Sequence, residues 1–106
     1  MALTRDFRDT IRARANRDTA FRRALLEEAV DLMLAGDVEA GRSTIRNYIN
    51  ATVGFERLAE TVHTPPESLM RMFSPRGNPT VKNLFGVISA LQKHEGISLT
   101  VHATAG

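Results

Sequence analysis

The apolar residues of this chain recur at helical spacing, and this pattern limits the possible folds more than any other feature. Four stretches carry an apolar residue at every third or fourth position, the spacing of one helix face, over about residues 4–15, 18–35, 37–53 and 80–95. A capping side chain precedes each of them and a glycine follows three, as at helix starts and ends. The predicted caps are Thr4, Asp18 or Thr19, Asp37 and Thr80, and the glycines are Gly36, Gly54 and Gly96.

Two shorter helices are predicted between residues 55 and 73, so the sequence as a whole predicts an all-α domain of five or six helices. A loop with two prolines and a glycine, residues 74–79, separates them from the last helix. The apolar positions expected to face the core on that helix are Val81, Leu84, Phe85, Ile88 and Leu91.

Residues 1–17 form a segment rich in arginine, and residues 18–106 form the domain proper. The pattern breaks at residues 16–18, which suggests a hinge between a basic helical arm and the body. Such an arm could lie along DNA. Aspartates interleave with the arginines, however, so we favour a solvated amphipathic helix, which could equally pack on a partner.

The bulk composition excludes several classes of protein. The chain has 106 residues, enough for one modest core, a formal net charge of +2 and no cysteine. No apolar leader or membrane span is visible, so we expect a cytoplasmic protein. The histidines His63, His94 and His102 lack ligand spacing, and no nucleophile, base or glycine-rich phosphate loop stands out. We therefore expect no metal, no cofactor and no enzymatic activity.

The segment from Phe55 to Phe73 has the spacing of a helix-turn-helix unit. Inward positions fall at Leu58 and Val62 on its first helix, and at Leu69 and Met72 on its second. A small residue, Ala59, stands where the two helices would cross. Thr64 is expected to cap the second helix, with Pro65 at its first position.

The second helix, residues 64–73, would be the recognition helix that enters the major groove of DNA. Arg71 could reach a guanine or a phosphate, Glu67 could accept a hydrogen bond from cytosine, and Met70 could touch a thymine methyl. The loop and the start of the last helix would hold phosphate. The full predicted DNA-binding set is Thr64, Pro66, Glu67, Ser68, Met70, Arg71, Arg76, Asn78, Lys82 and Asn83.

The tail alternates apolar and polar residues, which predicts one short β-strand over residues 97–102. A lone strand leaves backbone groups unpaired. Ile97, Leu99 and Val101 would therefore pair with a second copy across a two-fold axis, or with another protein. The remaining alternative is a segment folded back on its own helices, or a frayed tail.

Residues from about Phe21 to Ala103 resemble the small lambda-repressor-like helix-turn-helix regulators, and among these the antidote proteins of addiction modules. The resemblance rests on Leu58-Ala59, on Ser68–Arg71, on the loop 74–80 and on the helix 84–91 with its tail. It implies a homodimer that represses its own operon and, for the antidote branch, captures a small toxin encoded beside it. His63-Thr64 replaces the family's glycine and apolar residue in the turn, and Pro65-Pro66 replaces its serine or arginine.

The sequence therefore predicts a DNA-binding transcriptional regulator, and the resemblance implies that it represses its own operon. The alternative is an antitoxin or protein-interaction module that neutralises a small basic toxin, with weak or no specific DNA binding. The Pro65-Pro66 opening and the small net charge favour that alternative, whereas the basic residues around the loop 74–79 favour DNA.

Overall fold

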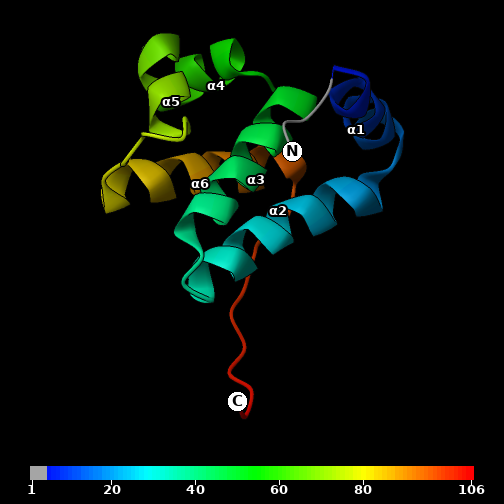
Figure 1. Ribbon diagram of the computed structural model, residues 1–106, viewed down its shortest axis with the longest axis vertical. Helices are drawn as coiled ribbons and strands as arrows, with labels where there is room; N and C mark the ends of the chain where they lie inside the picture. Colours follow the sequence, from blue (N-terminus) through cyan, green and yellow to red (C-terminus); the bar gives the residue numbers. More distant parts are fainter. Residues whose placement is uncertain (1–4) are drawn as a thin grey trace.

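The computed structural model describes the backbone of residues 5–106 and the side chains from residue 9 onward, and the part it describes is all helical (Figure 1). This confirms the predicted all-α class, with the larger of the two helix numbers in the described part. The six helices in this part are α1 (Arg5–Arg17), α2 (Thr19–Leu34), α3 (Val38–Ala51), α4 (Phe55–Val62), α5 (Pro66–Met72) and α6 (Val81–Glu95).

The predicted caps of α2, α3 and α6 are confirmed, with Asp18 and not Thr19 capping α2, whereas Thr4 lies outside the described residues. Asp18 accepts a hydrogen bond from the Phe21 amide at 3.0 Å, and Asp37 accepts one from the Ala40 amide at 3.2 Å. The Thr80 hydroxyl accepts one from the Asn83 amide at 3.1 Å. Each cap satisfies an amide that has no partner inside its own helix.

The predicted cap at Thr64 is wrong. Pro65 occupies the capping position of α5, and the Thr64 hydroxyl lies 3.3 Å from the Val62 carbonyl oxygen, to which it donates. A proline has no side chain that can accept a hydrogen bond, so α5 starts without a side-chain cap.

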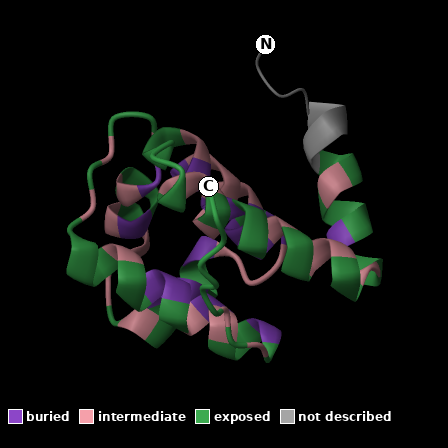
Figure 2. Ribbon diagram, turned by 90° about the horizontal axis from the view of Figure 1, so that it is seen from below, coloured by how far each residue is buried: buried purple, intermediate pink, exposed green. Residues whose placement is uncertain are grey.

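The core draws its buried side chains from α2 to α6, and within it α2 and α3 share the most extensive helix–helix contact. Figure 2 shows the buried residues on the sides of the helices that face one another. Gly41 lies in this α2–α3 contact, since a Cβ at this position would stand 2.8 Å from the Ala29 carbonyl oxygen. The largest of the fully buried side chains are Leu26, Ile45, Tyr48, Ile49, Leu58, Leu69, Phe73, Val87 and Leu91.

The end of the predicted N-terminal arm packs against the body of the domain. Ala15 is fully buried, and its carbonyl oxygen accepts a hydrogen bond from Arg22 at 2.7 Å. The Arg14 guanidinium stands 4.5 Å from the centroid of the Phe21 ring, a cation–π contact. α1 therefore joins the domain through its second half.

The inward face of α6 is rotated from the one predicted. Leu84 is half-buried, and Val87, Ile88 and Leu91 are buried, but Val81 is 73% exposed and Phe85 is 58% exposed. Assigning Val81 and Phe85 to the core was therefore wrong. The two lie one helical turn apart and form an exposed apolar pair near the start of α6.

The predicted strand over residues 97–102 is absent from the described chain. All other described elements are helices, so the segment finds no strand edge within the chain with which to pair. Ile97 and Leu99 instead pack against the core, and the Leu99 amide donates to the Gln92 side-chain oxygen at 2.8 Å. Only Val101 of the three predicted strand residues is exposed. The correct alternative for Ile97 and Leu99 was the segment folded back on its own helices.

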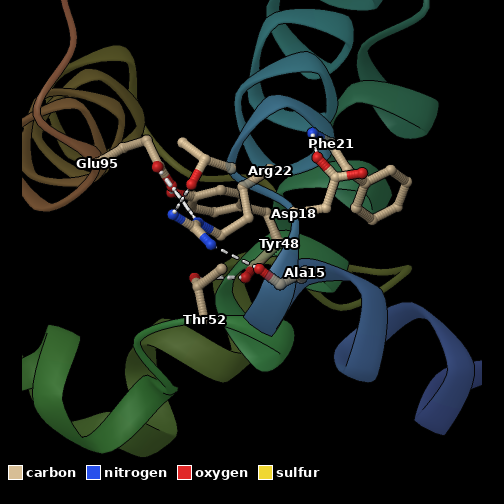
Figure 3. A network of polar contacts seen from close by, with 8 residues as sticks. Ala15, Asp18, Phe21, Arg22, Tyr48, Thr52 and Glu95 are labelled. Atoms are coloured by element: carbon tan, nitrogen blue, oxygen red, sulfur yellow. Dashed lines mark hydrogen bonds and ion pairs between the residues drawn. The ribbon is translucent and has the colours of Figure 1, made fainter.

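A polar network joins α6 to α2 and α3 (Figure 3). The Arg22 guanidinium contacts both Glu95 carboxylate oxygens at 3.1 and 3.2 Å, and the Tyr48 hydroxyl donates to the same carboxylate at 2.5 Å. Burial and the neighbouring carboxylate raise the pKa of Tyr48 well above its usual range, so the phenol stays a donor. Burial alone would raise the pKa of Glu95, but the hydrogen bonds from Tyr48 and Arg22 outweigh it and lower that pKa.

We expect this network to make the chain less stable in acid. Because the pKa of folded Glu95 lies below its ordinary value of 4.5, its carboxylate contributes stability above that pH. The contribution is lost as the pH falls through the lowered pKa. Urea unfolding of the wild type and of Glu95→Gln should show a difference in unfolding free energy that shrinks below about pH 4.5. A difference that stays constant from pH 7 to pH 3 would contradict this assignment.

Candidate nucleic-acid interface

α4 and α5 form a compact pair joined by residues 63–65 (Figure 1). Leu58, Ala59 and Leu69 are buried between this pair and the rest of the core, as predicted, and Val62 and Met72 are partly buried against it. The rings of Phe55 and Phe73, from the two ends of the pair, stand 6.4 Å apart. Sequence reasoning used these phenylalanines only as the limits of the segment and missed that they meet.

The turn between α4 and α5 adopts a backbone conformation that glycine favours, although it contains none. His63 has a φ of 54° and a ψ of 45°, in the left-handed region. The Ala59 carbonyl oxygen accepts hydrogen bonds from the amides of His63 and, at 3.1 Å, of Thr64. The chain therefore makes the same tight turn that a glycine at position 63 would allow at lower cost.

The outer face of α5 presents Glu67, Met70 and Arg71, which are all exposed. Thr64, Pro66 and Ser68, also in the predicted DNA-binding set, are half-buried. A cation, a carboxylate and an apolar side chain thus lie within about one helical turn of each other, whereas the half-buried three offer less contact area.

The residues predicted to hold phosphate lie in the loop after α5 and in the first turn of α6. Two are cations and two are amides, and all are exposed: Arg76, Asn78, Lys82 and Asn83. The Arg71 carbonyl oxygen accepts hydrogen bonds from the Ser74 amide at 3.2 Å and the Ser74 hydroxyl at 2.8 Å, so this loop begins against the end of α5. The structure therefore brings the α5 residues together with the loop, whereas the tail residues 97–101 follow the opposite end of α6.

Arg42 of α3 holds the loop in place, a role that sequence reasoning missed. Its Nη1 donates to the carbonyl oxygens of Met72, Ser74 and Gly77, the second at 3.1 Å. These carbonyls belong to the end of α5 and to the loop that follows it. The helical spacing held the signal, because Arg42 lies one turn before Ile45 on the inward face of α3.

Gly77 allows the loop to approach the end of α5 closely. A Cβ at this position would fall on the carbonyl oxygens of Arg71 and Met72, which are backbone atoms and cannot rotate away. The loop thus requires both the missing side chain at position 77 and the cation at position 42.

Replacing Gly77 by alanine should therefore destabilise the chain by about 1–3 kcal/mol, the usual cost of forced overpacking. Gly86 on α6 provides the matched control, since a Cβ there would have no atom within 4 Å. Gly86→Ala should stabilise by about 0.5–1 kcal/mol, because alanine is the better helix former. Thermal unfolding of both variants tests the pair. Equal effects of the same sign would show that the loop does not depend on close approach at position 77.

The charge balance of this surface favours anions. Arg71, Arg76 and Lys82 oppose one carboxylate, that of Glu67, among the exposed charged residues from the start of α5 to the first turn of α6. No group of three or more histidine, cysteine, aspartate or glutamate residues within the described chain could hold a metal ion. The surface can therefore supply hydrogen-bond donors and positive charge to an extended polyanion.

Comparisons with models of protein families, with curated proteins and with solved structures give no match to this chain. Among the helices of residues 5–106, none combines the length and the apolar character that crossing a bilayer requires.

Proposed function

We propose that this chain is a helix-turn-helix regulator that binds duplex DNA through α5 and represses its own operon. One observation carries the proposal: three cations, Arg71, Arg76 and Lys82, lie exposed on α5, its following loop and the start of α6. Arg42 fixes the loop that carries Arg76 to the core through three carbonyl oxygens, so this loop is held in place before DNA binds. A preorganised frame lowers the entropy lost on binding.

In this proposal α5 lies in the major groove. Arg71 reaches a guanine edge or a phosphate, Glu67 accepts from a cytosine amine, and Met70 contacts a thymine methyl. The phosphates that flank the groove are held by Arg76, Asn78, Lys82 and Asn83. The half-buried Thr64, Pro66 and Ser68 take a smaller part, so phosphate contacts dominate the affinity.

The regulator acts as a homodimer, since two copies read two half-sites one turn of DNA apart. The absent strand removes the pairing first expected over residues 97–101. The exposed pair Val81 and Phe85 on α6 supplies apolar surface of the kind that subunit contacts bury.

The test is a salt titration of binding to the DNA upstream of the gene, beside a scrambled duplex of equal length. We expect a preference for the upstream DNA and an affinity that falls steeply as salt rises. Equal weak binding to both duplexes, or none, would contradict the proposal.

Arg76 of the loop and Lys82 at the start of α6 should together account for a measurable part of the salt dependence. Arg76→Gln combined with Lys82→Gln removes two phosphate contacts, so the slope of log K against log salt should fall by about 1.8 and the affinity by about tenfold near physiological salt. Arg23→Gln combined with Lys93→Gln removes the same charge from exposed positions at the start of α2 and the end of α6. This control should leave the slope nearly unchanged. If both double variants lose affinity equally, net charge and not the loop drives binding.

A second candidate function is capture of a small basic toxin. Its support is an exposed acidic row on α2, formed by Glu27, Glu28 and Asp31, which complements a basic protein in sign. Failure of the DNA experiment would favour this candidate. Coexpression with a small basic protein encoded beside the gene then becomes the next measurement.

A further inference from the structure

A cavity of about 290 Å³ lies between α3 and the loop after α5, and the DNA-binding proposal does not use it. Arg42, Ser43 and Arg46 of α3 line one side, and Phe73, Ser74 and Pro75 line the other. Glu39, one turn before Arg42 and Ser43, also lines the wall. The volume suits a small ligand rather than a large cofactor.

Arg42 is a buried cation without a counter-ion. The residue is only 8% exposed, and the two ion pairs found in the described chain, Arg14–Asp18 and Arg22–Glu95, do not include it. Buried charges in proteins are normally paired, because an isolated one loses its hydration without compensation. Carbonyl oxygens partner its Nη1 but carry no full negative charge.

Three N–H groups of the same guanidinium have no protein acceptor, since every hydrogen bond of Arg42 runs through Nη1. Every fully buried side-chain nitrogen or oxygen in the described chain has a hydrogen-bond partner. Since Nε and Nη2 of Arg42 have none, these two atoms are not fully buried. These nitrogens therefore retain some access from outside, and the residue to which they belong lines the cavity. A guanidinium fork with free Nε and Nη2 matches two oxygens of one anion.

From this geometry we propose that the cavity is a binding site for a phosphate group, held by Arg42 with Arg46 as the second cation and Ser43 as a hydroxyl donor. Two cations against the single carboxylate of Glu39 leave a net positive charge for a phosphate to neutralise. Because Arg42 also holds the loop that follows α5, an anion here contacts the same side chain that positions the proposed DNA-binding loop. The site does not rest on the DNA-binding proposal, since a free phosphorylated ligand and the DNA backbone offer the same chemistry.

The test is a titration of inorganic phosphate into the full chain at constant ionic strength, followed by NMR. The resonances of the Arg42 Nε–H group and of the Ser43 and Ser74 amides report on the cavity. We expect saturable shifts at these positions. Arg46→Gln should weaken the apparent affinity about tenfold, and Glu39→Gln should strengthen it about threefold, since the two changes alter the local charge in opposite senses.

Arg57→Gln is the matched control, because Arg57 is exposed on α4 and does not line the cavity. It should leave the phosphate affinity unchanged. Shifts that do not saturate, or that Arg57→Gln reduces as much as Arg46→Gln does, would overturn the site. All three variants leave the contacts of Arg42 with the loop in place, so loss of folding does not obscure the result.

A second titration with duplex DNA identifies the source of the phosphate. If DNA shifts the same resonances and displaces inorganic phosphate, the backbone of the duplex occupies the cavity. If DNA binds without moving them, a free phosphorylated ligand is its occupant. If inorganic phosphate binds at Arg42 and DNA does not bind at all, only the regulator proposal is overturned. If DNA binds but inorganic phosphate does not bind at Arg42, only the phosphate-site proposal is overturned.

Discussion

Replacing Glu95 by alanine should lower the unfolding free energy by about 3 kcal/mol, one of the two largest effects we expect of a single substitution. Removing one partner of a buried ion pair typically costs 3–5 kcal/mol, because the other charge stays desolvated. The Glu95 side chain is 3% exposed, but that of Arg22 is 24% exposed, so Arg22 recovers some hydration when Glu95 is removed. We therefore expect a loss of unfolding free energy near the lower end of that range. The Tyr48 hydroxyl loses its acceptor in the same change. Urea or thermal unfolding measures the loss.

Two further variants separate the network from its side-chain volume. Glu27→Ala removes an exposed carboxylate from α2 and should change stability by less than about 0.5 kcal/mol. The combination Arg22→Met, Tyr48→Phe and Glu95→Leu replaces the whole network by apolar groups, and such replacements are often neutral or stabilising. If the triple variant is as unstable as Glu95→Ala, packing rather than the unpaired charge explains the loss.

The helices of this fold could be predicted because their signals are local. Periodicity, a capping side chain and a glycine all lie within a few residues of the helix end they determine. Asp18, Asp37 and Thr80 accept the expected hydrogen bonds for this reason. The predicted cap at Thr64 was wrong because, with two prolines following it, α5 starts one residue later than predicted. Boundaries of short helices depend on such single-residue choices.

Orientation is a global property, and there the sequence was less informative. A wide apolar stripe on α6 does not say which of its edges faces inward, so Phe85 was placed in the core although Val87 is buried instead. Alternation over residues 97–102 predicts a β-strand only where a partner strand is present, and the described chain contains no other strand. The Gln92 side chain and the core hold that segment in another way.

The elements of the candidate site could be predicted from the sequence, but the side-chain contacts that hold them in place could not. The turn, the exposed residues of α5 and the basic loop could all be proposed from one segment of sequence. Arg42 lies 35 residues from Gly77, whose carbonyl it binds, and Arg22 lies 73 residues from Glu95. No local pattern encodes such pairs. A charged residue on an inward helix face is the one signal that was available, and Arg42 carries it.

Arg71→Ala should weaken binding to the upstream DNA by about 1–3 kcal/mol, or roughly 5- to 150-fold, if its guanidinium contacts a base. The substitution should leave the fold intact, because the side chain is exposed and the hydrogen bonds at this residue use its backbone carbonyl oxygen. A base contact also predicts that the affinity for the scrambled duplex stays the same. Fluorescence anisotropy with both duplexes, at two salt concentrations, measures these quantities.

The pattern of loss across the two duplexes assigns the role of the residue. An equal loss of affinity for both duplexes, with a salt slope reduced by about 0.9, identifies Arg71 as a phosphate contact. In that case Glu67 and Met70 are the residues of α5 that contact the bases. Arg23→Ala removes one exposed cation from α2 and should leave the affinity for both duplexes unchanged. That result would exclude a simple effect of net charge. If Arg71→Ala binds every duplex as tightly as the wild type, α5 is not the helix that enters the groove. Since Arg71 is the one cation on the exposed face of α5, no other residue of that helix could then supply the attraction, and the acidic row of α2 becomes the surface to study.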